Sequence, residues 1–315
     1  MKRILVTGAA GYIGSAVCRK LLAHGYQVVG LDNLKYSSRD AVPVGADFFH
    51  RDICDSNLDR SGAFFRIDAV MHLAAESEIP TCTRDPLLAF RVNLSGGLNL
   101  LSAMQKNECN CLILSSTAAV YSPDAKSPIA EDAEKRPSTP YGASKHAFEK
   151  ALEWITEVRC ITFRYFNVCG ATESVWEQPR HRSRIVSIAM DTARKIRQSM
   201  PLNGIDFNTP DGTCVRDYLH VDDVADAHVL ALSRIGNTTG AFNLGTGKGH
   251  SNREVISTVE RVTGHSVSIT QSPRRPGDPA VLVADPSKAM SDLGWKPKFT
   301  ELESMIESAW RHEKL

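Results

Sequence analysis

The chain has 315 residues, of which 42% are hydrophobic and 23% charged, and its formal net charge is +1. This composition is typical of a folded protein with one large domain, or a domain with an added lobe, and it excludes a disordered chain. The near-zero charge disfavours nucleic acid as the main partner, and no apolar run is long enough to span a membrane.

The eight cysteines are scattered through the sequence, without a C-x-x-C pair and without His or Cys partners at metal-ligand spacing. We therefore expect free thiols and no metal site. Because no signal-peptide pattern precedes the first apolar run, we expect a cytoplasmic location.

Short apolar, β-branched runs alternate with longer segments of helical periodicity through the first half of the chain. The runs that we predict as strands are Arg3–Thr7, Gln27–Leu31, Asp47–His50, Ala69–Leu73, Cys111–Ser115 and Cys160–Tyr165. Helical periodicity covers Ile13–His24, Leu87–Lys106 and Tyr141–Ile155. Continuous apolar strands separated by helices predict an α/β fold with a doubly wound parallel Rossmann sheet. Ligands of such folds bind beyond the carboxyl ends of the strands.

The pattern changes after Tyr165. Residues 169–212 are rich in Pro, Arg, Asn and Gly, with a single helical stretch near Ile185–Met200. Residues 216–245 are sheet-like again, in the two runs Arg216–Val221 and Ala241–Leu244. We expect a nucleotide-binding core and a smaller, discontinuous C-terminal lobe that binds the substrate. The core would comprise 1–168 plus about 213–245, and the lobe about 169–212 and 246–315.

A glycine-rich turn separates the first predicted strand from the first predicted helix. Gly8 permits a tight turn, Gly11 lets the backbone approach a phosphate, and Gly14 lets the helix pack closely on the strand. The free N–H groups and the helix dipole favour a pyrophosphate there. Asp32 ends the second strand, where a carboxylate can bind an adenosine ribose, and no basic residue follows it before Lys35. NAD is therefore favoured over NADP.

Two later strand ends fit the same cofactor. Asp52 and Ile53 end the third strand, where an acid could reach the adenine amine, although a solvated strand-end aspartate is the alternative. Leu73, Ala74 and Ala75 end the fourth strand with side chains that let backbone pass close to a cofactor.

Tyr141 and Lys145 are spaced i,i+4, so both side chains lie on one face of the predicted helix. A tyrosine ordinarily has a pKa near 10. A nearby ammonium and the positive nicotinamide of NAD⁺ would lower it and make the phenolate accessible as a base. Ser115 and Thr117, at the end of the fifth strand, would place a hydroxyl beside Tyr141. Alone, the Tyr/Lys pair could be a solvated helix face.

Taken together, these motifs resemble those of the extended short-chain dehydrogenase/reductase superfamily. Further stretches resemble the UDP-glucose (UDP-galactose) 4-epimerases along nearly the whole chain. These stretches are Gly11–Ser15, Leu31–Leu34, Arg164–Asn167, Thr209–Tyr218 and Arg274–Asp278.

The resemblance implies an NAD-dependent nucleotide-sugar 4-epimerase that passes through a transient 4-keto sugar. Tyr141 would be its base, Lys145 would assist it, and Thr117 would bridge the sugar and the tyrosine. The cofactor residues implied are Gly8, Gly11, Tyr12, Ile13, Gly14, Asp32, Asn33, Asp52, Ile53, Leu73, Ala74, Ala75, Asn93, Ser115, Tyr141, Lys145 and Tyr165. The substrate residues implied are Thr117, Tyr141, Asn167, Ser183, Arg184, Arg216, Arg275 and Asp278. The partners implied are a UDP-sugar and a second copy of the chain, as a homodimer.

Several positions depart from that pattern or narrow it. Ala118 and Ala119 replace the acids that sugar dehydratases use, which disfavours elimination. Asn203 replaces the aromatic residue that usually stacks on uracil, so the resemblance supports uracil as the nucleotide base less strongly. Ser77 stands where some members have a lysine near the cofactor, and Leu282 leaves room for an N-acetylated sugar.

Arginines gather at one rim of the predicted site, where Ser183 and Arg184 follow Arg180 and Arg182. We interpret this run as a solvated loop. The alternative is that an arginine binds a carboxylate at C6 of the sugar, which would make the substrate a UDP-uronic acid such as UDP-glucuronate. A 4-ketoreductase on the same scaffold and a non-catalytic NAD-binding regulatory protein are further alternatives.

Overall fold

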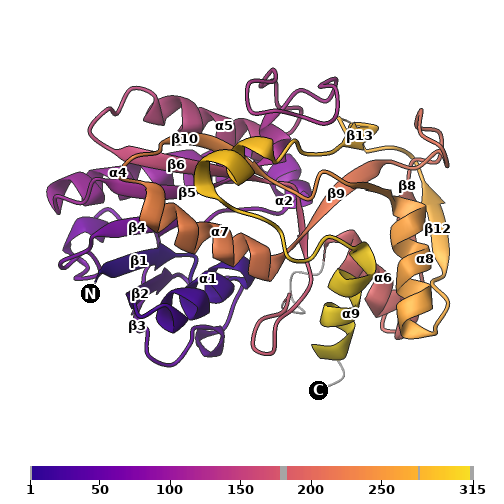
Figure 1. The fold of residues 1–315 in the computed structure, drawn as a ribbon, viewed down its shortest axis with the longest axis horizontal. Helices are drawn as coiled ribbons and strands as arrows, with labels where there is room; N and C mark the ends of the chain where they lie inside the picture. Colours follow the sequence, from indigo (N-terminus) through magenta and orange to yellow (C-terminus); the bar gives the residue numbers. More distant parts are fainter. Residues whose placement is uncertain (1, 178–182, 276, 313–315) are drawn as a thin grey trace.

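A computed structural model describes residues 2–177, 183–275 and 277–312. A seven-stranded parallel sheet with the order β10-β6-β5-β4-β1-β2-β3 forms its core (Figure 1). The strands of this sheet are β1 (Arg3–Thr7), β2 (Gln27–Asp32), β3 (Asp47–His50), β4 (Ala69–His72), β5 (Cys111–Thr117), β6 (Arg159–Tyr165) and β10 (Gly240–Leu244). All six predicted strands are present, and the predicted doubly wound α/β fold is confirmed.

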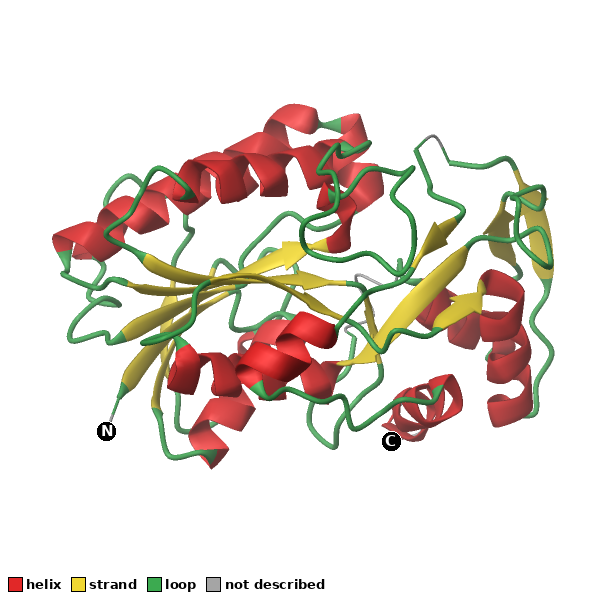
Figure 2. Cartoon of the chain, turned by 45° about the horizontal axis from the view of Figure 1, so that its top comes forward, coloured by secondary structure: helices red, strands yellow, loops and turns green. Residues whose placement is uncertain are grey.

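Helices cover both faces of the core sheet, as Figure 2 shows from the edge. On one face, α1 (Tyr12–Ala23) and α7 (Val221–Arg234) pack on side chains such as Val6 and Phe242. On the other face, the covering helices are α2 (Ile79–Arg84), α3 (Pro86–Phe90), the π-helical η3 (Arg91–Gly96), α4 (Gly97–Lys106) and α5 (Pro140–Leu152). Alternate residues of each strand face the two layers, as the pleat of a buried parallel sheet requires.

A smaller lobe lies beyond the carboxyl ends of the core strands (Figures 1 and 2). Its strands are β7 (Asn167–Cys169), β9 (Val215–His220), β11 (Gly249–Ser251) and β13 (Val281–Leu282) in one sheet, and β8 (Met200–Asn203) and β12 (Ile269–Ser272) in another. Its helices are α6 (Ile185–Ala193), α8 (Asn252–Thr263) and α9 (Leu302–His312), which bury a second apolar cluster.

Short helical turns complete the described chain. They are η1 (Arg39–Ala41), η2 (Leu58–Arg60), η4 (Ala118–Val120) and the π-helical η6 (Ala289–Leu293). Among the described helices, none combines the length and the apolar character needed to cross a bilayer. All eight cysteines are free of disulfides.

Three predicted elements differ from those in the structure. The helix predicted over Leu87–Lys106 is interrupted by η3, and the one predicted over Ile185–Met200 ends at Ala193. Met200 instead begins β8, because β12 from much later in the chain pairs with it. The two sheet-like runs expected within residues 216–245 are present as β9 and β10, and α7 lies between them. β9 itself, expected in the core, belongs to the sheet of the lobe.

Candidate active site

A cavity of about 770 Å³ lies between the carboxyl ends of the core strands and the lobe. Parallel strands place their last residues at one edge, so motifs far apart in the sequence meet there. The predicted site residues that line it are Gly8, Gly11, Tyr12, Ile13, Gly14, Asp32, Asn33, Asp52, Ile53, Leu73, Ala74, Ala75, Ser115, Thr117, Tyr141, Lys145, Tyr165, Asn167, Ser183, Arg184, Arg216, Arg275 and Asp278.

The glycine-rich turn is packed so tightly that side chains at its glycines would clash. A Cβ on Gly14 would lie 1.9 Å from the carbonyl oxygen of Gly8, and one on Gly8 would lie 2.7 Å from the Ala74 nitrogen. Gly8 also has a φ of +71°, which L side chains rarely adopt. Gly11 precedes α1, and no described side chain caps this helix. Its first N–H groups therefore face the cavity and fit a pyrophosphate.

The end of β2 forms a carboxylate site next to this turn. The Asp32 carboxylate accepts hydrogen bonds from the N–H groups of Ala10 at 3.0 Å and Leu34 at 2.8 Å. Asp32 is 8% exposed, and burial raises the pKa of its carboxyl. A fixed carboxylate of this kind suits a ribose diol. At the end of β3, the Asn33 amide donates to Asp52 at 2.8 Å and joins the two strand ends.

Glu76 was not predicted from the sequence, although it lines the same end of the cavity. It is 2% exposed, and its Oε2 accepts from the Tyr36 hydroxyl at 2.5 Å and lies 3.5 Å from the Lys35 ammonium. Lys35, the first basic residue after Asp32, is therefore already engaged by a carboxylate. This pairing fits NAD, because a 2′-phosphate would need a free cation. Glu76 directly follows the small residues Ala74 and Ala75, which is the only sequence signal that marks it.

Asn93 is the one predicted cofactor residue that does not line the cavity. Its amide oxygen accepts from the Glu76 N–H at 2.8 Å, and its amide nitrogen donates to the Glu76 carbonyl at 3.0 Å and to Ser144 Oγ at 2.9 Å. It lies in the π-helical turn η3 and is 1% exposed. Asn93 thus joins the loop after β4 to α5, one layer behind the site.

The N-terminal turn of α5 carries Tyr141 to the end of β5. Thr139 caps this helix by accepting from the Gly142 N–H at 3.1 Å. A Cβ on Gly142 would lie 2.2 Å from the Ala119 carbonyl oxygen, so only glycine allows this close contact between α5 and the turn after β5. The contact brings the Tyr141 phenol within hydrogen-bond distance of the Thr117 hydroxyl. Thr117 and Tyr141, 24 residues apart in the sequence, therefore act on the same point in the cavity.

Burial governs the ionisation of both candidate catalytic groups. It raises the pKa of Tyr141 to about 12, against the Thr117 hydrogen bond and the charge of Arg184, which lower it. It also lowers the pKa of Lys145 to about 8, against the charge of Glu149, which raises it. The lowered tyrosine pKa that we expected is thus not a property of the protein groups alone. Strongly shifted pKa values in a cavity are nevertheless typical of functional sites.

Ser115 and Tyr165 form the wall of the cavity next to Thr117. The Ser115 hydroxyl hydrogen-bonds the Tyr165 phenol, which also lies 2.9 Å from Nε2 of His228 in α7. Strands β5 and β6 pair in register so that Thr117 lies opposite Tyr165. The two neighbouring strand ends and the α7 layer therefore hold this wall in place.

The lobe supplies cations and polar groups at the far end of the cavity. Arg216 and Arg275 line it with Asp278, and the Arg216 guanidinium lies 4.0 Å from the Asp278 carboxylate. β9 is held by the buried Asp217, which accepts from the N–H groups of Thr246 at 2.8 Å and Gly247 at 2.9 Å. Two guanidinium groups, one on β9 and one on the loop before β13, suit a diphosphate.

Arg184 does not reach the cavity as a free cation. Its guanidinium donates to Glu177 at 2.5 Å and lies 5.4 Å from the centre of the Tyr12 ring. Glu177 is 8% exposed and also accepts from the Ser187 hydroxyl. The sequence contains no signal for this ion pair, because only the folded chain brings the Arg184 and Glu177 side chains together. The predicted rim residues Arg180 and Arg182 lie outside the described residues.

Comparison with known proteins agrees with this geometry. Residues 4–245 match the NAD dependent epimerase/dehydratase family. The chain is 42% identical to a UDP-glucose 4-epimerase of Lacticaseibacillus casei, over 98% of this chain and 96% of that protein.

Two solved structures share the fold over almost their whole length. One is a UDP-glucose 4-epimerase of Bifidobacterium longum in complex with NAD⁺ and UDP, with a TM-score of 0.94 and 33% identity, covering 99% of this chain and 98% of that one. The other is the enzyme of Stenotrophomonas maltophila with bound NAD and formylated UDP-arabinopyranose, with a TM-score of 0.94, 37% identity, and coverage of 100% and 98%. The chain therefore belongs to the NAD dependent epimerase/dehydratase family.

Proposed function

We propose that this protein is an NAD-dependent UDP-glucose 4-epimerase, which interconverts UDP-glucose and UDP-galactose through a transient 4-keto sugar. The observation that carries the proposal is the meeting of Thr117, Tyr141 and Lys145 in a cavity whose far end bears Arg216 and Arg275. A base and a dinucleotide site at one end, with a diphosphate site at the other, would suit a nucleotide sugar that lies across the reacting groups. The similarity to UDP-glucose 4-epimerases over nearly the whole chain supports the same substrate.

In this reaction the Tyr141 phenol oxygen takes the proton from the sugar 4-hydroxyl and later returns it. NAD held by the glycine-rich turn and Asp32 would supply the hydride chemistry at the sugar C4. Thr117 donates a hydrogen bond that favours the ionised phenol. The Lys145 ammonium, one helical turn from Tyr141 and also lining the cavity, would add positive charge there. The keto sugar must turn between the two transfers so that its other face meets the cofactor.

The turn after β5 argues against a sugar dehydratase. Ala118 and Ala119 line the cavity directly beyond Thr117, where elimination would need a proton donor. Neither methyl group can donate a proton. The chemistry that the described residues support therefore ends at oxidation and reduction of C4.

Within the lobe, Arg216 and Arg275 would hold the diphosphate, and Asn167 and Asp278 the ribose of the nucleotide. Ser183 and Asn203 line the same part of the cavity, and neither supplies an aromatic ring to stack on uracil.

The Arg184–Glu177 ion pair favours a neutral sugar over a UDP-uronic acid. Glu177 is buried beside the guanidinium that would have to bind a C6 carboxylate, and it would repel that carboxylate. Leu282 lines the cavity on another side and is smaller than an aromatic residue, which favours UDP-N-acetylglucosamine as a second substrate.

A panel of nucleotide sugars, followed by NMR of the products, tests the proposal. We expect UDP-galactose from UDP-glucose without added NAD, slower conversion of UDP-N-acetylglucosamine, and no conversion of UDP-glucuronate. The preference for UDP-glucose over UDP-glucuronate should survive Arg184→Leu. Failure to convert UDP-glucose, or release of a stable keto sugar, would refute the proposed function.

We also propose that the protein is a cytoplasmic homodimer. The layer of α3, α4 and α5 exposes large apolar side chains, with Leu87 77%, Leu98 40% and Trp154 87% exposed. The eight free cysteines are in keeping with a reducing compartment. Light scattering should give twice the mass of one chain, which is 34.6 kDa. Leu98→Glu should shift the measured mass from that of the dimer toward that of one chain. A monomer in the unaltered protein at all concentrations would contradict the dimer.

A further inference from the structure

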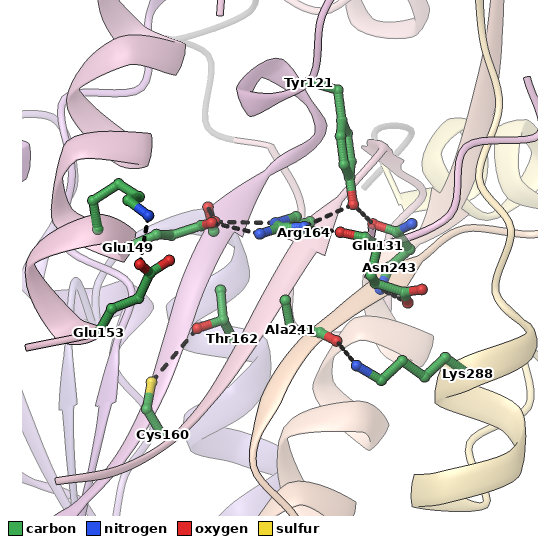
Figure 3. A network of polar contacts seen from close by, with 12 residues as sticks. Tyr121, Glu131, Glu149, Glu153, Cys160, Thr162, Arg164, Ala241, Asn243 and Lys288 are labelled. Carbon is green, nitrogen blue, oxygen red and sulfur yellow. Dashed lines mark hydrogen bonds and ion pairs between the residues drawn. The ribbon is translucent and has the colours of Figure 1, made fainter. Parts of the chain in front are cut away.

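A buried ion pair lies directly behind the catalytic helix (Figure 3). Glu149 of α5 accepts from Arg164 of β6 through two bonds, Nε to Oε1 at 3.2 Å and Nη2 to Oε2 at 2.7 Å. Their side chains are only 8% and 6% exposed. Ser116 of β5 lies opposite Arg164 in the sheet and donates to the same carboxylate. One carboxylate therefore joins α5 to both strands that form the wall of the active site.

Arg164 is held from its other side as well. Its Nη1 donates to the Tyr121 hydroxyl at 3.0 Å and to the Glu131 carbonyl at 3.0 Å. The Tyr121 hydroxyl donates in turn to the Asn243 amide of β10 at 2.7 Å, as Figure 3 shows. These contacts fix the orientation of the guanidinium, so that two of its nitrogens can donate to the two oxygens of the Glu149 carboxylate.

Glu149 lies one helical turn beyond Lys145, at the i,i+4 spacing at which lysine and glutamate ordinarily pair. That pair is not formed here. Throughout the described ranges 2–177, 183–275 and 277–312, the Lys145 ammonium has no hydrogen bond and no ion pair. Lys145 is 3% exposed and lines the cavity next to Tyr141. Its charge is available in the cavity because the Glu149 carboxylate, one turn along the same helix, is bound to Arg164.

We propose that Arg164 is a positioning residue, which holds Glu149 away from Lys145 and so keeps the lysine at the catalytic tyrosine. The inference rests on the epimerase function proposed above. Opposite charges in a buried setting attract strongly, so a Glu149 released from Arg164 would draw in Lys145, the buried cation one helical turn before it on α5. The lysine would then leave the cavity, and the Tyr141 phenolate would lose its positive neighbour.

A double-mutant cycle tests this role. In Arg164→Met, Glu149 is released, and we expect kcat to fall about 100-fold with KM changed by less than about threefold. In Glu149→Gln, the amide oxygen still accepts from Arg164 and Ser116 without charge, and we expect kcat to stay within about fivefold of the unaltered enzyme. In the double variant no carboxylate can capture the lysine, so kcat should recover at least about tenfold over Arg164→Met.

That recovery separates the proposal from a merely structural role, in which the second substitution would add to the damage. Far-UV circular dichroism and bound NAD report folding in each variant. If Arg164→Met does not fold, Arg164→Lys replaces it, since lysine cannot hold both oxygens; we expect about a tenfold loss that Glu149→Gln reverses. Glu153→Gln is the matched control, because it removes only the exposed Lys150–Glu153 pair at the end of the same helix.

Each result of the double-mutant cycle either supports or overturns the positioning role of Arg164. Full kcat in a folded Arg164→Met or Arg164→Lys, or no recovery in the double variant, overturns the positioning role. An unaltered enzyme that does not epimerise UDP-glucose defeats the proposed function instead, so the two failures are distinguishable.

Discussion

Tyr141 and Lys145 share a buried setting that disfavours the charged form of each. Burial raises the pKa of the tyrosine to about 12 and lowers that of the lysine to about 8. In the proposed mechanism, proton transfer would therefore depend on partners that stabilise charge, namely Thr117, the lysine and the cofactor. These roles follow motifs short enough to be predicted from spacing. Glu76 and Glu177 could not be predicted, because each is defined by a partner that only the fold brings near.

Removal of the phenol oxygen should stop proton transfer without disturbing the cofactor site. We expect Tyr141→Phe to lower kcat by about 10²–10⁴-fold while NAD stays bound, since phenylalanine keeps the packing. Steady-state kinetics and the NAD content of the purified protein measure the two effects. Tyr26→Phe, outside the cavity lining, is the control. A Tyr141→Phe enzyme with nearly full kcat would remove the tyrosine from the mechanism.

The pH dependence of kcat should report Lys145. Because burial lowers the pKa of its ammonium to about 8, the group is charged below that pH and neutral above it. We therefore expect kcat to decline above about pH 8, by up to about tenfold per pH unit. Lys145→Met should lower the plateau and abolish this descending limb. A profile that stays flat above pH 8 in the unaltered enzyme would show that the charge of Lys145 is not required.

At the scale of elements, the strands were predictable and the irregular helices were not. Apolar runs mark strands of a buried parallel sheet, and their predicted ends are shifted by no more than two residues. The predicted helix over Leu87–Lys106 is broken by the π-helical turn that lets Asn93 reach Glu76, and tertiary contacts of this kind leave no periodic signal. The helix predicted over Ile185–Met200 is shortened because β8 pairs with β12.

The close packing between the turn after β1 and the start of α1 should be disrupted by a single added methyl group. A Cβ at Gly14 would lie 1.9 Å from the Gly8 carbonyl oxygen, so Gly14→Ala must push α1 away from the turn. We expect a loss of about 1–3 kcal/mol in the free energy of unfolding, together with loss of bound NAD. Thermal unfolding and the NAD content measure both effects.

Gly236→Ala is the matched control for this substitution, since a Cβ there meets no described atom within 4 Å. It should keep its NAD and its melting temperature. If Gly14→Ala also kept both, the tight junction would not be what holds the cofactor.

At the scale of the whole molecule, the cavity exists because the chain leaves the core after β6 and returns to it at α7 and β10. The core cofactor site is built from segments early in the sequence, and its position at the carboxyl edge follows from the parallel sheet. The lobe was predicted as discontinuous, yet the sequence pattern assigned β9 to the core. β9 pairs with β7, β11 and β13, and such pairing between distant strands cannot be read from local periodicity.

The central claim is that C4 of the sugar loses a hydride and regains the same hydride, with a tightly held NAD as the group that would carry it. The most direct test uses UDP-glucose with deuterium at C4, without added NAD and in ordinary water. We expect UDP-galactose that retains the deuterium at C4, as seen by NMR and mass spectrometry. Deuterium lost to solvent, with hydrogen in its place at C4, would contradict the account.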